Sequence, residues 1–312
     1  MKAVLPAAAR PLLEPHLPAD IDIVWFTKPA EANAMIADAD IAWVDMQPPE
    51  LVADAIRQAG PTLKWVSTIY AGLDAFPLGT LRDNGVTLTN GAGINAVAVA
   101  EYAVMAVLVA AKRFDTVVRA QDRHEWLKDA PGKIELAGTK ALVVGYGTIG
   151  KMIGDRLSAF GVDVTGVTRT GRDGTLTPDA WRDRLGDFDW IILAAPSTSA
   201  THALIGRDEL VAMKPSAWLI NIARGDMIDD DALIAALTAG GIAGAVLDPT
   251  SPEPLPPEHP LWSTPNAIVT MHLSGRSQTT MFARGAALFL DNLAAFLANK
   301  PMRNVADLDA GY

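Results

Sequence analysis

The chain has 312 residues, 50% of them hydrophobic and 20% charged, so it can bury a large core and is not an intrinsically disordered protein. Its formal net charge is −10 and its lysines and arginines form no basic block, which argues against nucleic acid and against an anionic membrane surface as partners. The absence of cysteine excludes disulfides, Cys-ligated metals and thiol nucleophiles, and we expect no metal site. The length favours two domains.

The N-terminal sequence MKAVLPAAAR contains an apolar stretch interrupted by proline. This stretch is too short for the core of a signal peptide, so we interpret it as a first strand. The longest apolar run, residues 102–111, is shorter than the roughly 20 residues of a membrane span and is typical of a buried helix. We therefore expect a cytoplasmic protein.

Short β-rich runs alternate with helical stretches over the first part of the chain. Such alternation predicts an α/β fold with a parallel sheet. The expected strands are residues 2–6, 21–26, 41–46, 63–69 and 86–90.

A second series of this kind begins near residue 140, with expected strands at residues 141–145, 162–168, 190–195, 217–223, 242–248 and 267–271. Six strands alternating with helices indicate two mononucleotide-binding halves. A final helix, residues 278–300, has apolar residues at helical spacing and is expected to return to the first domain. The chain would then cross between the domains near Asn95 and again near Arg276.

The segment between the two series has a different character. Residues 96–111 predict an apolar helix, whereas residues 112–138 are mixed in polarity and include Phe114, Val117, Val118 and Trp126. We interpret the mixed segment as an arm or a dimer surface.

A glycine-rich turn follows the first strand of the second series, where residues 140–150 read KALVVGYGTIG. Gly145, Gly147 and Gly150 provide the tight turn, the close approach to a pyrophosphate and the close packing of helix on strand that dinucleotide binding requires. The backbone N–H groups of Thr148 and Ile149, at the positive end of the helix, would face the diphosphate. This strand, turn and helix together predict a dinucleotide site.

The next expected strand ends about 20 residues beyond the glycine turn, where an NAD site places a carboxylate on the ribose. This chain has Arg169, Thr170 and Arg172 there instead. A guanidinium binds a 2′-phosphate through charge-assisted hydrogen bonds, so the pattern favours NADP over NAD. Alternatively, Arg169 is an ordinary solvated residue at a strand end.

Three further strand ends carry residues with catalytic potential. Arg224 lies in NIARGD, Glu253 lies in the proline-flanked DPTSPEPLP, and His272 lies in MHLSG. The carboxyl ends of parallel strands meet at the ligand crevice of a cofactor domain. Of the five histidines, only His272 falls at such a strand end.

With these motifs in this order, the sequence resembles the D-isomer-specific 2-hydroxyacid dehydrogenases over nearly its whole length. YAGLD, residues 70–74, is similar to the family's substrate loop, and NAVAVAE, residues 95–101, is similar to its domain crossing. Two positions depart from the common pattern: Met271 stands where many relatives have proline, and Arg169 stands where NAD-preferring members have an acid. Members with arginine there are typically NADPH-dependent glyoxylate, hydroxypyruvate or broad 2-keto acid reductases.

The resemblance implies a flavodoxin-like substrate domain, residues 1–95 and 279–312, with an inserted Rossmann-like dinucleotide-binding domain, residues 96–278. It also implies a homodimer formed through the cofactor domain, and a small 2-keto or 2-hydroxy acid as substrate. Further cofactor contacts are implied for Pro196, Thr201, Ala223, Asp248, Ser274 and Gly275. Asp248 has the alternative interpretation of a helix-capping or turn residue.

The resemblance also implies roles in catalysis. Arg224 would clamp the substrate carboxylate, which backbone amides of Ala71 and Gly72 in the Tyr70 loop would hold from the other domain. His272 would donate the proton to the developing alkoxide, and Glu253 would bond its other ring nitrogen and fix its tautomer.

The residues that set the size of the substrate pocket are less readable. Candidates near the ends of the N-terminal strands are Trp43, Met46, Gln47, Tyr70, Leu73 and Phe76. The alternative is that most of the aromatic ones belong to the core.

Other functions stay open at this point. The related scaffold supports phosphoglycerate, phosphite or formate dehydrogenases, and it also occurs in dinucleotide-sensing binding proteins that recruit peptides. A methyltransferase with a glycine-rich loop would not need Arg224, Glu253 and His272 together.

Overall fold

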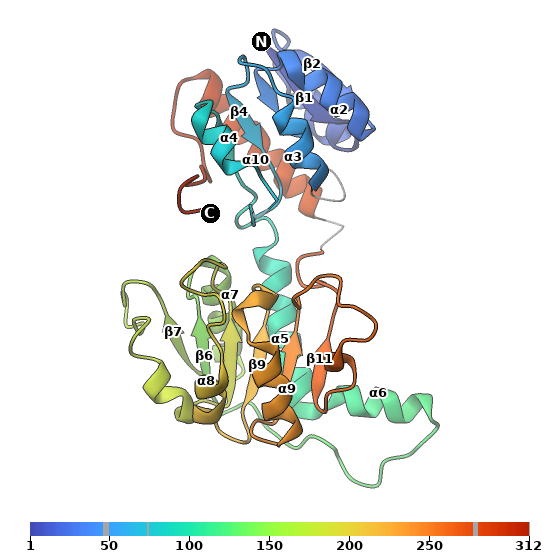
Figure 1. The fold of residues 1–312 in the computed structure, drawn as a ribbon, viewed down its shortest axis with the longest axis vertical. Helices are drawn as coiled ribbons and strands as arrows, with labels where there is room; N and C mark the ends of the chain where they lie inside the picture. The colour runs from blue at the N-terminus through green and yellow to red at the C-terminus, as the bar shows by residue number, and fades with distance from the viewer. Residues whose placement is uncertain (46–49, 74, 277–279, 312) are drawn as a thin grey trace. The chain divides into compact units, whose positions relative to one another are not determined.

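The computed structural model describes residues 1–45, 50–73, 75–276 and 280–311, and the chain divides into two compact units. Unit 1 comprises Met1–Asn95 and Ser277–Tyr312, and unit 2 comprises Ala96–Arg276. The colours of Figure 1 show that the C-terminal helix belongs with the N-terminal elements. Unit 2 is therefore an insertion in unit 1.

Unit 1 contains a parallel sheet of strand order β2-β1-β3-β4-β5. This order is that of the flavodoxin-like doubly wound fold. The strands are β1 (Lys2–Pro6), β2 (Asp22–Phe26), β3 (Ile41–Ala42), β4 (Trp65–Ser67) and β5 (Thr87–Thr89). The helices are α1 (Arg10–Leu13), α2 (Pro29–Met35), α3 (Glu50–Arg57), α4 (Leu78–Asp83) and α10 (Met281–Leu297).

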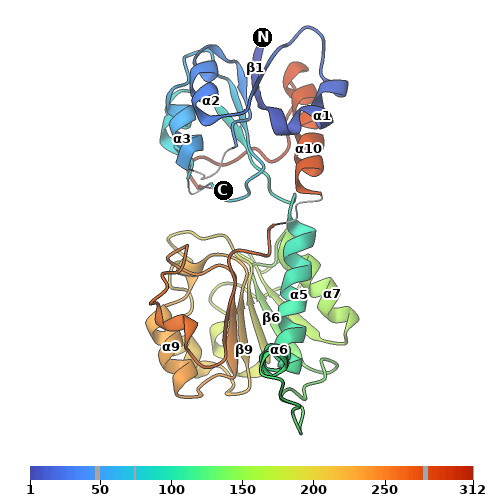
Figure 2. The same ribbon diagram turned by 90° about the vertical axis from the view of Figure 1, so that its right-hand side faces the viewer.

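Helices cover both faces of the unit 1 sheet, with α2 and α3 on one side and α1 and α10 on the other (Figure 2). Alternate residues of each strand point to opposite faces. Val4 of β1 accordingly packs in the cluster that contains the buried side chains of α2, α3 and α4, whereas its neighbours Ala3 and Leu5 pack toward Phe289 of α10. The sheet is buried on both faces, as a parallel sheet requires.

Unit 2 contains a six-stranded parallel sheet of order β11-β10-β9-β8-β6-β7. Its strands are β6 (Lys140–Val144), β7 (Asp163–Val167), β8 (Trp190–Leu193), β9 (Trp218–Asn221), β10 (Gly244–Leu247) and β11 (Ala267–Val269). An isolated parallel bridge joins Val167 of β7 to Leu176. The strand order reverses between β6 and β8, and such a switch point is where doubly wound sheets bind ligands.

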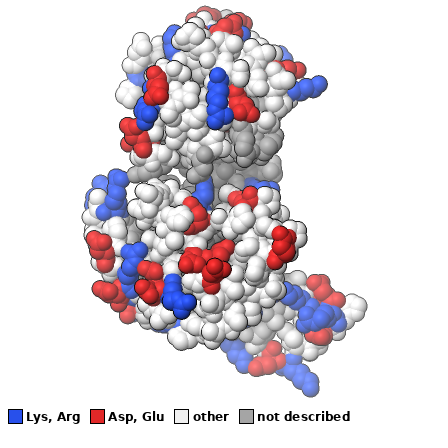
Figure 3. Space-filling view, viewed as in Figure 1, with Lys and Arg blue, Asp and Glu red and all other residues white. Residues whose placement is uncertain are grey.

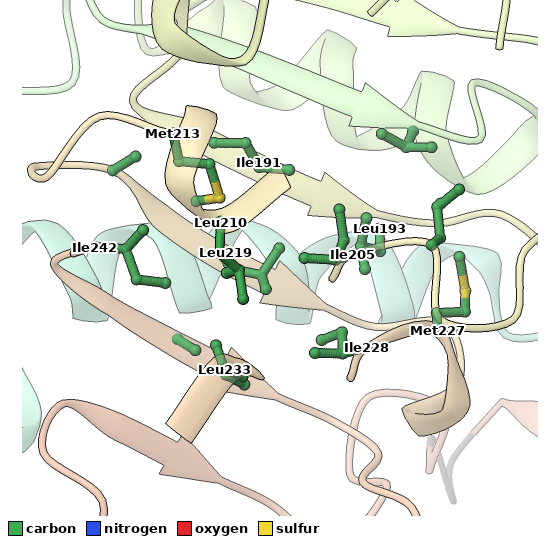
Figure 4. Packing of buried hydrophobic residues seen from close by; sticks show 14 of the residues in the cluster. Ile191, Leu193, Ile205, Leu210, Met213, Leu219, Met227, Ile228, Leu233 and Ile242 are labelled. Carbon is green, nitrogen blue, oxygen red and sulfur yellow. The ribbon is translucent and has the colours of Figure 1, made fainter. Parts of the chain in front are cut away.

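Helices α5 (Ala96–Lys112) and α7 (Thr148–Ala159) pack on one face of this sheet, and α9 (Asp230–Thr238) packs on the other (Figure 2). Helix α8 (Arg207–Ala212) packs in the same cluster as α9. Figure 4 shows Leu219 of the sheet beside Leu210 of α8, and Leu193 beside Ile205; Leu233 of α9 belongs to the same buried cluster. The expected fold class, two Rossmann-like parallel-sheet domains, is confirmed.

The apolar residue that follows α7 is partly exposed. Ile153 and Leu157 of α7 are buried, whereas the Phe160 side chain is 46% exposed. Helix α7 ends at Ala159, and Phe160 has φ −89° and ψ 6°, so its side chain leaves the buried stripe.

The segment after α5 begins with helix α6 (Phe114–Asp122), which Figure 1 shows extending away from the sheet of unit 2. We call residues 114–138 the arm. Its apolar side chains Phe114, Val117 and Val118 are exposed, and Trp126 is 93% exposed. Such a group of exposed apolar residues is typical of an interaction surface.

The charges on the surface are mixed in sign. Figure 3 shows acidic and basic side chains interspersed over the face that it draws. In the part of the chain that the structure describes, no helix is long and apolar enough to cross a membrane.

Candidate active site

The glycine-rich turn joins β6 to α7 in the conformation that its sequence predicts. Gly145 has φ +98°, and a Cβ built on it would lie 2.3 Å from the backbone N of Ala195. A Cβ on Gly150 would lie 2.2 Å from the carbonyl oxygen of Gly145, whereas a Cβ on Gly147 would meet nothing within 4 Å. Two glycines therefore allow close backbone packing, and Gly147 leaves open the space that a pyrophosphate needs. These residues fit a bound dinucleotide.

Tyr146 occupies the variable position inside this turn and packs against two more glycines. A Cβ on Gly154 of α7 would lie 2.3 Å from the Tyr146 hydroxyl, and a Cβ on Gly166 of β7 would lie 2.3 Å from Cγ of its ring. The phenol thus fills the space between helix and strand, and its pKa is raised by burial.

The chain folds back sharply after β7. The Thr168 hydroxyl accepts a hydrogen bond from the backbone N–H of Gly171 at 3.0 Å, and Thr168 N donates to the carbonyl oxygen of Leu176 at 3.0 Å. Arg169, Thr170 and Arg172 lie in this turn, and all three are exposed. The structure thus places two arginines at the carboxyl end of the strand beside the glycine turn.

Arg224 follows β9 in an extended conformation, and a hydrogen-bonded turn holds its backbone. The buried side chain of Asn221 donates to the carbonyl oxygen of Arg224 at 2.7 Å and accepts from the N–H of Ala223 at 3.0 Å. Arg224 Nη1 donates to the carbonyl oxygen of Ala223 at 2.8 Å. A Cβ on Gly225 would lie 2.1 Å from the carbonyl carbon of Thr250, so only glycine fits after the arginine.

Glu253 and His272 lie together although they follow different strands. Nδ1 of His272 is 3.0 Å from Oε1 and 3.1 Å from Oε2 of Glu253. The His272 side chain is 36% exposed, and its Nε2 has no hydrogen-bond partner among the described residues. A carboxylate at Nδ1 holds the proton on that nitrogen, which leaves Nε2 to exchange a proton with a ligand.

Asp248 lies at the end of β10, fully buried, beneath the segment that carries His272. Its Oδ1 accepts hydrogen bonds from Thr270 Oγ1 at 2.5 Å and Leu273 N at 2.6 Å, and its Oδ2 accepts one from Ser274 N at 2.8 Å. These bonds bracket His272, which has φ +60°, an uncommon value for this residue type. Asp248 therefore holds the backbone around His272 in place, and its expected contact with the nicotinamide side stays a prediction.

The other expected cofactor residues line the neighbouring loops. Thr201 closes a turn by donating to the carbonyl oxygen of Pro196 at 2.8 Å, and it accepts from the N–H of Thr198 at 2.8 Å. Ser197 in this turn donates to Asp226 at 2.8 Å, which ties it to the segment after Arg224. Ala223 and Ser274 are buried, and Gly275 is half-buried.

The expected substrate loop belongs to unit 1. Tyr70 is half-buried, Ala71 is exposed and Gly72 is half-buried. No described residue accepts a hydrogen bond from the backbone N–H of Ala71 or Gly72. Backbone N–H groups without a partner among the described residues are available to donate to a carboxylate.

Three of the six candidates for pocket size are buried in the core of unit 1. Trp43, Leu73 and Phe76 are buried, and the Trp43 ring lies 5.5 Å from that of Phe289. Trp43 packs in the cluster that contains α10, whereas Leu73 and Phe76 pack in the cluster on the other face of the sheet, with residues of α2, α3 and α4. The candidates Met46 and Gln47 lie outside the described residues, as does Asp74, the last residue of the substrate loop motif.

Residues 104–274 match the family model described as D-isomer specific 2-hydroxyacid dehydrogenase, NAD binding domain. The chain belongs to this family. The matched range contains the glycine turn together with Arg224, Glu253 and His272. The family resemblance seen in the sequence is confirmed.

The chain is 34% identical over 259 residues to glyoxylate/hydroxypyruvate reductase B of Pectobacterium atrosepticum. The aligned region covers 79% of this chain and 80% of the relative. A D-isomer specific 2-hydroxyacid dehydrogenase family protein from Aeromonas salmonicida has a similar structure, with a TM-score of 0.86, 28% identity and 99% of each chain covered. The NADPH-dependent glyoxylate/hydroxypyruvate reductase of Sinorhizobium meliloti, solved with NADP and malonate, matches with a TM-score of 0.79 and 26% identity over 99% of this chain and 98% of that one.

Sequence reasoning missed residues that position the candidate catalytic groups. The Tyr102 hydroxyl is 2.6 Å from Thr270 Oγ1, which in turn donates to Asp248. Burial, with a smaller contribution from the charge of Asp248, raises the pKa of Tyr102 to about 12, so its hydroxyl stays protonated. Neither Tyr102, in an apolar helix, nor Thr270, at a strand end, belongs to a motif that would have revealed this chain of hydrogen bonds.

Proposed function

We propose that this 2-hydroxyacid dehydrogenase reduces a 2-keto acid of the glyoxylate or hydroxypyruvate kind to the D-2-hydroxy acid, with NADPH as the preferred cofactor. The observation that carries the proposal is the His272–Glu253 pair, held by Asp248 at the strand ends of a domain with a dinucleotide-binding turn. Similarity to reductases of glyoxylate and hydroxypyruvate supports the substrate class.

Each proposed role follows from the chemistry of the side chain. Bound NADPH would supply the hydride. The guanidinium of Arg224 would bind the substrate carboxylate, and the N–H groups of Ala71 and Gly72 would bind it as well. His272 would donate a proton from Nε2 to the developing alkoxide, while Glu253 at Nδ1 would hold the ring in its tautomer and orientation.

A panel of 2-keto acids, followed at 340 nm with NADPH and with NADH, tests the proposal. We expect glyoxylate and hydroxypyruvate to be reduced, with the larger kcat/KM for NADPH. An enzyme that turned over formate, phosphite or 3-phosphoglycerate with a dinucleotide, and none of the keto acids, would refute the substrate assignment. Binding of NADPH without turnover of any substrate would instead support a dinucleotide-sensing protein.

The cofactor preference is proposed to depend on Arg169, aided by Thr170 and Arg172. Charge-assisted hydrogen bonds to the 2′-phosphate, weakened by solvent, are expected to favour NADPH over NADH by roughly 10- to 100-fold in kcat/KM. Arg169→Asp should reverse the preference, because an acid repels the phosphate and can bond the free ribose hydroxyl of NADH. The measurement is kcat/KM for each cofactor at low and at moderate salt, since added salt should weaken the preference.

The same charge reversal at Arg184 provides the control. Arg184 precedes β8 and so lies toward the amino-terminal ends of the strands, whereas Arg169 follows the carboxyl end of β7. We expect Arg184→Asp to keep the preference of the unmodified enzyme. Equal use of both cofactors by the unmodified enzyme, or no change in Arg169→Asp, would leave Arg169 as an ordinary surface residue.

We also propose that two copies associate through unit 2, with the apolar side chains of the arm in the interface. Sedimentation velocity at micromolar concentration should give a species of about twice the 33.0 kDa of one chain. Trp126→Glu should shift it toward the monomer, because a charge in an apolar interface is costly to bury. Val211→Glu replaces an exposed apolar residue of α8 and should leave the dimer intact. A 33 kDa species alone in the unmodified protein would contradict the proposal.

The cytoplasmic location expected from the sequence is part of this proposal. Fractionation of cells that produce the protein tests it, and recovery of the protein with the membrane or the periplasm would contradict it.

A further inference from the structure

The carboxylate of Asp45, which has no proposed catalytic role, lies next to the proposed substrate loop of unit 1. Asp45 follows β3, and its oxygens accept three hydrogen bonds: from Trp43 Nε1 at 2.7 Å, from Thr68 Oγ1 at 2.6 Å and from Ile69 N at 2.6 Å. No described basic side chain pairs with it. Burial raises the pKa of Asp45 to about 6, so at neutral pH it is mostly ionised and can accept all three bonds.

Thr68 connects Asp45 to Tyr70 through two hydrogen bonds. Its hydroxyl donates to Asp45 and accepts a hydrogen bond from Tyr70 N at 3.0 Å. The Thr68 side chain is buried, so water does not compete for these bonds. Asp45 and Thr68 therefore occupy the N–H groups of Ile69 and Tyr70 in succession.

The carbonyl groups of the loop are also held. Tyr70 O accepts from Gly91 N at 2.8 Å, and Ala71 O accepts from Asn90 Nδ2 at 3.4 Å. The next two N–H groups, those of Ala71 and Gly72, are the ones left without a partner among the described residues. The hydrogen bonds to Asp45, Thr68, Asn90 and Gly91 thus leave only the N–H groups of Ala71 and Gly72 available to a ligand, among the described residues 69–72.

We propose that Asp45 is a positioning residue that acts through Thr68 to hold residues 69–72 in the conformation that binds the carboxylate of the keto acid. This inference rests on the proposed function of the loop. A half-buried carboxylate without a cation is costly, and a neutral residue would avoid that cost. The cost is offset here because a carboxylate can accept from three donors, whereas an asparagine would present its NH₂ group to one of them.

The substitutions separate this role from a merely structural one. Asp45→Asn and Thr68→Val should each raise KM for glyoxylate about tenfold or more, because a loop that is no longer held loses binding of the carboxylate. They should change kcat by less than about threefold, since the carboxylate is bound equally in the ground state and the transition state. Thr68→Ser keeps the hydroxyl and should recover most of the loss in KM.

Thr89→Val is the matched control. Thr89 is a buried threonine at the end of β5, and its hydroxyl accepts from Trp65 Nε1 at 2.9 Å rather than contacting the loop. Its removal also deletes a buried hydrogen bond, so any general loss of stability should be similar. We expect Thr89→Val to keep KM within twofold of the unmodified enzyme.

Hydrogen–deuterium exchange of a peptide spanning residues 66–73 provides a readout that needs no substrate. Exchange should be faster in Asp45→Asn and Thr68→Val, and unchanged in Thr89→Val. Unchanged exchange in the first two variants, or an unchanged KM despite faster exchange, would overturn the inference. If the unmodified enzyme reduced no keto acid, the proposed function would fall, and loop exchange alone would decide whether Asp45 holds the loop.

Discussion

His272→Ala is expected to lower kcat for keto acid reduction by about 10²- to 10⁴-fold, the range typical of losing a general acid. The affinity for NADPH should stay nearly unchanged, because the glycine turn and the end of β7 are separate from the imidazole. Steady-state kinetics with glyoxylate, and a fluorescence titration of NADPH, measure the two quantities independently.

Two further variants show whether the loss is specific. His124→Ala removes an exposed histidine of the arm and should have no effect on kcat. Glu253→Gln keeps an oxygen that can accept from His272 Nδ1, so it should cost less than His272→Ala, whereas Glu253→Ala should cost more than Glu253→Gln. A near-normal kcat in His272→Ala would exclude this histidine as the proton donor.

Arg224→Ala is expected to lower kcat/KM for glyoxylate by about 10²- to 10⁴-fold. A charge-assisted hydrogen bond contributes about 1.5–3 kcal/mol, and a guanidinium can make two of them with one carboxylate. Arg224→Lys should recover only part of the loss, because an ammonium group cannot make the same planar pair of bonds. Measurement of kcat and KM separately shows how the loss divides between binding and chemistry.

The matched control for this arginine is Arg207→Ala, which removes an exposed arginine at the start of α8 in the same unit. We expect its kcat/KM to equal that of the unmodified enzyme. If Arg224→Ala retained a near-normal kcat/KM with glyoxylate, the proposed carboxylate clamp would be wrong.

The parts of the site that a local pattern determines could be predicted from the sequence. The glycines at 145, 147 and 150 have the spacing of a dinucleotide turn, and the structure shows the steric reason for each of them. The alternation of strands and helices placed Arg224, Glu253 and His272 at neighbouring strand ends, because parallel strands bring their carboxyl ends to one edge.

Contacts between distant segments could not be predicted. Thr270 and Asp248 are 22 residues apart and Thr68 and Asp45 are 23 apart, and neither pair has a recognisable spacing. The sequence also does not decide whether an aromatic residue such as Trp43 lines a pocket or lies in the core, since a large apolar side chain suits both. Trp43 is buried in a cluster that includes residues of other strands and Phe289 of the distant C-terminal helix.

Hydride transfer to the carbonyl carbon of a 2-keto acid is the central claim, and the labelled product tests it most directly. Hydroxypyruvate is incubated with the unmodified enzyme and NADPH that carries deuterium at the transferable position, and the glycerate formed is analysed by chiral chromatography and mass spectrometry. We expect D-glycerate with the deuterium on C2. L-Glycerate, a racemic product, or D-glycerate without deuterium would contradict it.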